Sequence, residues 1–375
     1  MKANIINPFI VSGYLSPDYF CDRKEETERL LSALRNGRNV LLTSPRRMGK
    51  TGLIFHAFHQ LKRQRANTLY IDLFPTENLA DFTKVFASSV LGQLDSDPVK
   101  LVKKASAVIK GIRPILSIDE MTGQPRLSLD LAKGKEESTL EDVFTYLRES
   151  GKECFIAFDE FQQIANYPES NIESILRSHI QRLPRIHFIF SGSQAHMLSE
   201  MFLSPKRPFY QSTSSQVIGA IDEASYFSFA EAFLKRQGRD LPRDVFHTLF
   251  ARFEGHTWYI QKVLNQIYEM ADRPIDDELA REAVRVIIDE NTYYYQMLTR
   301  AYSKGQVKLM KAVAKEGKVK EITSGAFIAR YDLKATSSIK TSLKKLLEDE
   351  VIYRSEDGYL IYDRFYGEWL SNAYN

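Results

Sequence analysis

The chain has 375 residues, 43% of them hydrophobic and 26% charged, a composition that excludes a disordered or fibrous protein and predicts two or three globular domains. The net charge of +3 does not by itself imply a polyanionic partner, and the two cysteines, Cys21 and Cys154, exclude a disulfide framework and a zinc-binding spacing. No apolar run is long enough to span a membrane and no signal peptide is recognisable, so we expect a cytoplasmic protein without a membrane partner.

The first 222 residues alternate between helix and strand patterns. An irregular lead-in is followed by a helix that begins near Asp22-Arg23-Lys24-Glu25-Glu26, with acids near its positive end. Further helices are predicted at 49–65, 79–94, 139–149 and 172–181, and strands at 40–43, 68–73, 153–158, 186–190 and 217–221. Ser138 and Thr139 are the cap candidates of the 139–149 helix. This alternation predicts a parallel sheet covered on both faces.

Residues 96–137 interrupt the alternation and are predicted to form an insertion. A basic amphipathic helix is expected at 99–109. Leu127, Leu129 and Leu131 alternate with polar residues, which is the period of a half-exposed strand. We therefore predict a β-hairpin whose strands, 115–119 and 126–131, flank Met121-Thr122-Gly123-Gln124.

The strand pattern stops after Asp222. Helices are predicted at 225–237, 242–253, 258–271 and 276–298, which form a separate helical domain over residues 223–300. Residues 301–375 predict helices at 307–314, 324–330 and 337–347, then a hairpin of strands 351–354 and 359–362 with an Asp-Gly turn. Three helices and a hairpin predict a winged helix. Tyr293-Tyr294-Tyr295 is expected to pack between these two domains.

The most informative motif, Ser44-Pro45-Arg46-Arg47-Met48-Gly49-Lys50-Thr51, lies between a predicted strand and a predicted helix. It matches the phosphate-binding P-loop, G-x-x-x-x-G-K-[ST], except that Ser44 replaces the first glycine. The backbone N–H groups of such a loop point at phosphates, and the following helix adds its positive end.

The motif assigns a task to each residue of a nucleoside triphosphate site. Gly49 lets the backbone approach closely, Lys50 is expected to reach the β- and γ-phosphates, and Thr51 is expected to ligate Mg²⁺. Arg46 and Arg47 contribute backbone N–H groups and are expected to point their side chains outward, towards solvent or an acidic neighbour. The cofactor-binding segment thus predicted runs through Gly52, and the alternative is a surface Gly-Lys-Thr at a helix start.

A second motif, Asp159-Glu160, ends a predicted buried strand. Charges at such a strand end face the ligand edge of a parallel sheet. Asp159 is expected to hold Mg²⁺, usually through water, and Glu160 to orient and deprotonate the attacking water. The pair therefore predicts ATP hydrolysis, and the alternative is two exposed acids that cap the next helix.

Two more stretches are candidates for contact with the γ-phosphate. Ser191, Ser193 or Gln194, which follow the fourth strand, could sense it, or could simply form a turn. Arg207 could act as an arginine finger that stabilises transition-state charge, or could belong to a solvated basic loop.

The chain resembles the archaeal-type P-loop ATPases, which are similar to the STAND class of signalling ATPases, over nearly its whole length. The resemblance rests on these stretches: Asn7-Pro8-Phe9, Phe20-Cys21-Asp22-Arg23, the P-loop, Asp159-Glu160-Phe161-Gln162-Gln163 and Ser191-Gly192-Ser193. It implies an α/β P-loop core of the ASCE type over residues 1–222, an α-helical lid and a C-terminal winged-helix domain. It also implies that Phe20 and Arg23 lie near the adenine, and that the Ser191 strand lies between the strands of the two motifs.

Two departures from the family pattern predict slow or partner-dependent hydrolysis. Ser212 follows Phe209-Tyr210-Gln211 where the family often has an arginine. The lid has Gly255-His256-Thr257-Trp258 where the family often has a proline.

The charge of the winged helix leaves its partner open. Residues 301–345 hold eleven lysines and arginines against three acids, a net of +8 that favours DNA. Residues 346–375 hold seven acids against two arginines, a net of −5 that favours a protein partner or packing on the core.

Three hypotheses follow. The leading one is an ATP-dependent molecular switch in which ATP binds between core and lid, hydrolysis reorients the winged helix, and self-association can depend on the nucleotide. The second is a regulator that binds double-stranded DNA and uses its nucleotide site structurally. The third is a scaffold with a degenerate P-loop, against which Lys50, Thr51, Asp159 and Glu160 argue.

Overall fold

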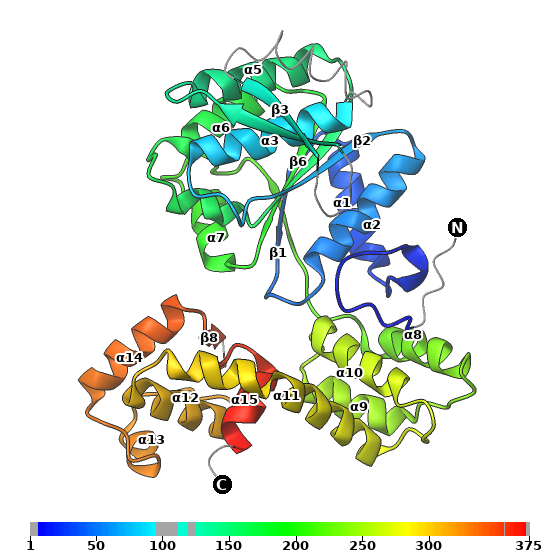
Figure 1. The fold of residues 1–375 in the computed structure, drawn as a ribbon, viewed down its shortest axis with the longest axis vertical. Helices are drawn as coiled ribbons and strands as arrows, with labels where there is room; N and C mark the ends of the chain where they lie inside the picture. The colour runs from blue at the N-terminus through cyan, green and yellow to red at the C-terminus, as the bar shows by residue number, and fades with distance from the viewer. Residues whose placement is uncertain (1–6, 95–111, 119–124, 356, 373–375) are drawn as a thin grey trace. The chain divides into compact units, whose positions relative to one another are not determined.

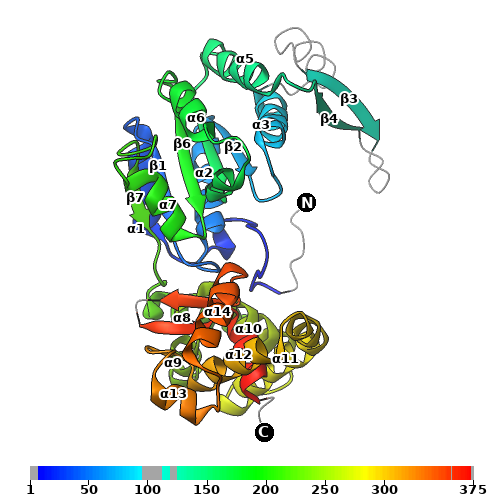
Figure 2. The same ribbon diagram turned by 90° about the vertical axis from the view of Figure 1, so that its left-hand side faces the viewer.

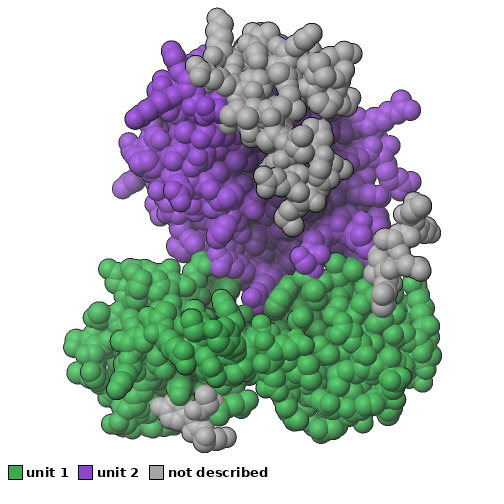
Figure 3. All heavy atoms as spheres, in the orientation of Figure 1, with its two compact units in different colours: residues 1–11, 223–375 green, residues 12–222 purple. Residues whose placement is uncertain are grey.

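The computed structural model describes residues 7–94, 112–118, 125–355 and 357–372. The chain divides into two compact units, labelled in Figure 3: unit 2 is Ser12–Asp222, and unit 1 joins Met1–Val11 to Glu223–Asn375. The chain therefore passes between the units twice, after Val11 and after Asp222. Within the described ranges, no helix is both long and apolar enough to cross a membrane.

Unit 2 is built on a five-stranded parallel sheet (Figure 1) with the strand order β2-β5-β6-β1-β7. The strands are β1 (Val40–Thr43), β2 (Asn67–Asp72), β5 (Cys154–Asp159), β6 (Ile186–Gly192) and β7 (Ser214–Val217). Strand β6, which carries Ser191, pairs with β1 on one side and β5 on the other. The strand order implied by the family resemblance is therefore confirmed.

Helices cover both faces of this sheet, as the alternating pattern predicted. The helices of unit 2 are α1 (Lys24–Arg35), α2 (Lys50–Arg63), α3 (Leu79–Leu94), α5 (Glu136–Glu149), α6 (Ile172–Ile180) and α7 (Ala195–Leu203). Leu42 and Phe155 join the core under α1 and α2, whereas Leu41 and Ile156 join the core under α3, α5, α6 and α7. Successive strand residues thus enter opposite cores, which explains why the central strands are continuously apolar.

The predicted insertion contains an antiparallel hairpin of β3 (Ile112–Ile118) and β4 (Pro125–Leu131). Figure 2 shows it extending beyond α3 and α5. The hairpin prediction is confirmed, and the helix predicted at 99–109 lies outside the described residues.

Two local predictions in unit 2 were wrong, and one helix was missed. The fifth strand is Ser214–Val217 and not 217–221, because this edge strand is polar and half exposed. Helix α5 begins at Glu136, so Ser138 and Thr139 lie inside it and Lys135 is at the cap position. Helix α7 was not predicted at all.

Unit 1 begins with a helical layer that corresponds to the predicted lid. Its helices are α8 (Glu223–Lys235), α9 (Arg243–Arg252), α10 (Thr257–Glu269) and α11 (Asp277–Arg300). The N-terminal segment packs on it: the buried Phe9 ring contacts Phe233 and Tyr268, and the Asn7 amide donates to the carbonyl of Asn265 at 2.9 Å. The Asn7-Pro8-Phe9 stretch therefore belongs structurally with residues more than 200 positions later.

The winged helix is present in the same unit. It comprises α12 (Lys304–Glu316), α13 (Gly325–Arg330), α14 (Thr336–Glu348), the antiparallel strands β8 (Ile352–Ser355) and β9 (Gly358–Ile361), and an unpredicted α15 (Arg364–Asn372). Tyr295 of α11 packs against Tyr366 and Trp369 of α15. The packing prediction is right for Tyr295 but wrong for Tyr293 and Tyr294, which are 74% and 61% exposed.

Candidate functional site

The phosphate-binding loop connects β1 to α2 at the carboxyl edge of the sheet. Arg47 and Gly49 adopt left-handed backbone angles, φ 67° and 91°, which fold the loop tightly before the first turn of α2. Lys50 is 7% exposed, and its Nζ donates to the carbonyl and to the Oγ of Ser44, both at 3.3 Å. The serine that replaces the usual glycine thus helps to hold the lysine under the loop, and its own hydroxyl donates to the carbonyl of Pro45.

The acid pair meets the loop where β5 ends. Asp159 is 5% exposed, and its Oδ2 accepts a hydrogen bond from Thr51 Oγ1 at 2.9 Å. Its Oδ1 accepts from Ser191 Oγ at 2.5 Å and from the backbone N–H of Glu160 at 3.1 Å. Two strands, β5 and β6, and helix α2 therefore meet at one carboxylate, as expected for strand ends of a parallel sheet.

Glu160 is held by the loop that follows β6. Its Oε2 accepts from the Ser193 hydroxyl at 2.9 Å, from the Ser193 backbone N–H at 3.3 Å, and from Gln162 Nε2. Arg46 Nε donates to the same Ser193 hydroxyl at 3.0 Å, so of the two predicted surroundings, solvent or an acidic neighbour, the Arg46 side chain takes the side of the cluster that holds Glu160. Ser193 thus connects the phosphate loop to the second acid.

Burial and charge act against each other at this site. Burial lowers the pKa of Lys50, and the nearby Glu160 and Asp159 carboxylates only partly oppose that shift. Burial raises the pKa of Asp72, the last residue of β2, and the proximity of Asp159 and Glu160 raises it further. Around this loop, ionisable groups therefore lie closer to one another, and deeper, than they would in water.

Tyr70 on β2 is a member of the site that the sequence did not single out. Its hydroxyl donates to Asp159 Oδ2 at 2.6 Å, the same oxygen that Thr51 reaches. Burial, followed by Asp159, raises the pKa of Tyr70 strongly, so it remains a donor at any physiological pH. One signal in the sequence could have found it: strands β2 and β5 both end in an acid. Aligning the two acids gives the observed register, in which Asp72 pairs with Asp159 and Tyr70 pairs with Ala157.

Phe20 and Arg23 lie against the loop and the helix after it. The Phe20 ring lies 3.3 Å from where a Cβ on Gly52 would be, and it stacks on His56 with centroids 4.4 Å apart. Arg23 is 3% exposed and donates to the carbonyls of Met48 at 3.1 Å and Gly219 at 2.7 Å. These contacts bring the N-terminal segment of unit 2 onto the phosphate loop.

Arg207 is not brought to the acids of this site. Its guanidinium pairs with the buried Glu173 of α6 and lies 4.0 Å from Glu200 of α7. Burial raises the pKa of Glu173, and the charge of Arg207 counteracts this.

The arrangement can hold a triphosphate and one hard cation. Among the described residues, no group of three or more His, Cys, Asp or Glu side chains could ligate a metal. Mg²⁺ keeps most of its water and needs only one or two protein oxygens beside substrate phosphates, so Thr51 and Asp159 are a sufficient donor set.

Family models match two parts of the chain. Residues 20–200 match an ATPase domain predominantly from Archaea, and residues 293–372 match a probable winged helix domain. No protein with a curated description matches the chain.

Two solved structures share the fold at low sequence identity. A Walker-type ATPase of Pyrococcus abyssi is 19% identical with a TM-score of 0.65, and the match covers 97% of this chain and 99% of that one. The ORC1 protein of Aeropyrum pernix, solved in complex with DNA, is 15% identical with a TM-score of 0.53, covering 94% and 93%. The fold is therefore a parallel-sheet ASCE-type P-loop core, a helical region and a C-terminal winged helix.

Proposed function

Because residues 20–200 belong to the family of ATPase domains found predominantly in Archaea and residues 293–372 form a winged helix domain, we propose that this protein is a Mg²⁺-dependent, ATP-binding and ATP-hydrolysing molecular switch. One observation carries the proposal: the Thr51 hydroxyl meets the Asp159 carboxylate at 2.9 Å beside the buried Lys50. The alternative, a surface Gly-Lys-Thr at a helix start, does not explain why the lysine is buried next to a strand that ends in an acid.

The proposal gives each residue a role. The backbone of the loop from Ser44 to Gly52 cradles the phosphates, and Lys50 neutralises charge on them. Glu160 orients and deprotonates the attacking water once Gln162 and Ser193 release its Oε2. Ser191 positions Asp159, and Phe20 and Arg23 border the adenine site.

Mg²⁺ fits the donors that this chain presents. Thr51 and Asp159 would hold it, because hydroxyl and carboxylate oxygens are the ligands it prefers. When bound, it would neutralise the charge that develops on the phosphate oxygens.

Arg207 enters the proposal as an arginine finger. To act in this way it must leave Glu173, whose buried carboxylate would then lose its counter-charge. The role therefore belongs to a conformational step, in which a rearrangement or a second copy of the chain brings Arg207 to a γ-phosphate. This step would make hydrolysis slow and dependent on a partner or on self-association.

Nucleotide binding is tested by Lys50→Ala, with Lys62→Ala as the matched control, since Lys62 is an exposed lysine on the same helix. We expect Lys50→Ala to lose binding of a fluorescent ATP analogue and Lys62→Ala to keep it. Equal binding by both variants would contradict the proposed site.

The switch itself needs a separate measurement. Cys21 and Cys154 are buried, so fluorophores can be attached at Glu137→Cys in unit 2 and Lys334→Cys in unit 1. We expect energy transfer between them to differ between the ATP-bound and ADP-bound states. Identical energy transfer in the ATP-bound and ADP-bound states would contradict the proposed switch and leave only the proposed ATPase activity.

A second candidate, DNA binding by the winged helix, is favoured by its surface charge and by the fold shared with the ORC1 protein solved with DNA. Several basic side chains of this domain already form ion pairs, among them Lys345, which pairs with Asp349 at 2.8 Å. Lys334 and Lys340, beside and within α14, are exposed, and no ion pair engages them among the described residues. These two lysines are the proposed phosphate contacts.

Duplex binding measured across a series of salt concentrations decides this candidate. If Lys334 and Lys340 contact phosphates, removing each should weaken binding and lower the salt slope by about 1. Lys345→Ala is the control and should change little. No detectable duplex binding would leave a protein partner for this domain.

A further inference from the structure

Strand β7 lies at one edge of the sheet and pairs with β1 only. The N–H groups of Ser214 and Ile218 donate across this pair to the carbonyls of Asn39 and Thr43, both at 2.8 Å. Alternate residues of a parallel strand bond to the same neighbour, so the backbone groups of the residues between them face the other way.

The free edge is therefore carried by Ser215 and Val217. By this alternation their backbone N–H groups face away from β1, on the side of the sheet where no further strand is paired among the described residues. Both side chains are exposed, that of Val217 to 73%. An edge strand of this kind is a template for one more strand.

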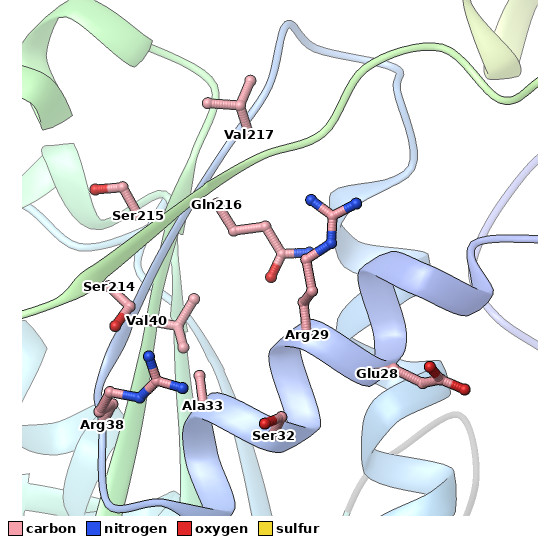
Figure 4. A pocket seen from close by; sticks show the side chains of 10 residues that line it. All are labelled: Glu28, Arg29, Ser32, Ala33, Arg38, Val40, Ser214, Ser215, Gln216 and Val217. Atoms are coloured by element: carbon pink, nitrogen blue, oxygen red, sulfur yellow. The ribbon is translucent and has the colours of Figure 1, made fainter.

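A cleft of about 650 Å³ runs between β7 and α1. Its lining comes from both elements and from the start of β1, and includes Arg29, Arg38, Gln216 and Glu28. Figure 4 shows Gln216 and Arg29 extending toward one another between the strand and the helix, Arg38 close to the start of β7, and Glu28 pointing away from the strand. Side chains of an added strand would thus enter a space that already exists.

The charge of this cleft favours an acidic occupant. Arg38 is exposed, and no ion pair or side-chain hydrogen bond engages its guanidinium among the described residues. Arg29 is paired with Glu25 at 2.9 Å, but both side chains are largely exposed, and such a pair contributes little. Two guanidinium groups are therefore available along a strand that offers unpaired backbone groups.

We propose that β7 and this cleft bind an extended acidic segment of a partner protein, which adds to the sheet beside β7. Its backbone pairs with Ser215 and Val217. Because strand side chains alternate between faces, every second residue faces Arg29 and Arg38 and is acidic, while the others lie on the face of Val217 and are apolar. The site is separate from the nucleotide site, so it holds whether or not the protein hydrolyses ATP.

The test uses a fluorescent seven-residue peptide in which glutamate and valine alternate, capped at both ends, and its counterpart with lysine in place of glutamate. Fluorescence anisotropy with the full chain should give binding of the glutamate peptide and at least about tenfold weaker binding of the lysine peptide, the sign expected for electrostatic complementarity. No binding of the glutamate peptide would overturn the proposal.

Proline variants test the edge itself. Ser215→Pro and Val217→Pro each remove an outward N–H and leave the bonds to β1 intact, a position where edge strands tolerate proline. Each should weaken the peptide about fivefold, the worth of one net hydrogen bond, without lowering the melting temperature. Gln216→Pro, whose N–H faces β1 by the same alternation, is the control that should destabilise the fold. Unchanged peptide affinity in both outward variants would overturn the proposal.

Charge variants keep the test decisive if a proline variant fails to fold. Arg38→Glu leaves Arg29 opposite the new carboxylate and should abolish the preference for the glutamate peptide, whereas Arg63→Ala, which removes an exposed arginine on α2, should leave it unchanged. A retained preference in Arg38→Glu would overturn the proposal. Sedimentation of the wild-type chain separates the remaining case: self-association that the outward proline variants abolish would mean that a second copy occupies the edge, and this too would overturn the proposal.

Discussion

Tyr70 offers a direct test of how Asp159, the proposed magnesium ligand, is positioned. Its hydroxyl donates to Asp159 Oδ2 at 2.6 Å, and Thr51 donates to the same oxygen. Tyr70→Phe removes this one donor and keeps the ring, so the packing against Phe55, 4.7 Å away between centroids, is preserved. The variant therefore changes how the Asp159 carboxylate is oriented and leaves the packing of the ring unchanged.

The expected size of the effect follows from the charge of Asp159, the partner of the Tyr70 hydroxyl. A hydrogen bond to an ionised group contributes about 1.5–3 kcal/mol, roughly twice a neutral one. Residues that orient a metal ligand change metal affinity about 10- to 100-fold when they are removed. We expect Tyr70→Phe to raise the Mg²⁺ concentration needed for half-maximal binding of an ATP analogue about tenfold, and to lower the melting temperature by several degrees.

The assay is a Mg²⁺ titration at fixed concentration of a fluorescent ATP analogue, with Tyr167→Phe as the matched control. Tyr167 is buried in the same unit, and its hydroxyl bonds to Thr76 Oγ1 at 2.5 Å, away from the carboxylates. That variant should also lose stability but should keep the wild-type Mg²⁺ requirement. An unchanged Mg²⁺ requirement in Tyr70→Phe would mean that the Tyr70 hydroxyl does not orient Asp159.

Two further predictions concern the same site. Gly192→Ala would place a Cβ 1.9 Å from Gln162 Oε1 and 3.0 Å from Leu198. It should therefore displace Gln162 from Glu160, lower the free energy of unfolding by about 1–3 kcal/mol and slow ATP turnover. Gly92→Ala, with open space around it, is the control that should leave turnover unchanged, and equal turnover in both variants would contradict the expectation. Because burial lowers the pKa of Lys50, the fold disfavours the charged form of this lysine at neutral pH. In the absence of added nucleotide, Lys50→Met should therefore raise the melting temperature at pH 7, and the gain should shrink as the pH approaches the ordinary lysine value of 10.5. A lower melting temperature of Lys50→Met at pH 7 would contradict this.

The sequence was sufficient where local signals and a topological rule agree. An apolar run before Ser44 and a Gly-Lys-Thr after it specify strand, loop and helix, and β1 and α2 follow that layout. The meeting of Thr51 and Asp159 required one further rule, that strand ends of a parallel sheet share an edge.

The sequence was insufficient where contacts depend on strand register or on exposure. Tyr70 looks like an ordinary strand former, and only the pairing of β2 with β5 gives its hydroxyl a carboxylate. Strand β7 lies at the edge of the sheet, where its residues are half buried or exposed and need not be apolar. The prediction placed the fifth strand on the more apolar residues that follow it. The pair of Arg207 with Glu173 joins α6 to a loop more than 30 residues later, which no local pattern specifies.

Single-turnover hydrolysis by Glu160→Gln decides whether Glu160 activates water at the proposed ATP site. The amide keeps the size of the side chain but cannot take up a proton. We expect this variant to bind Mg²⁺ and ATP as the wild type does, yet to hydrolyse ATP at least about 100-fold more slowly, a typical contribution of a general base. Hydrolysis at the wild-type rate would contradict it.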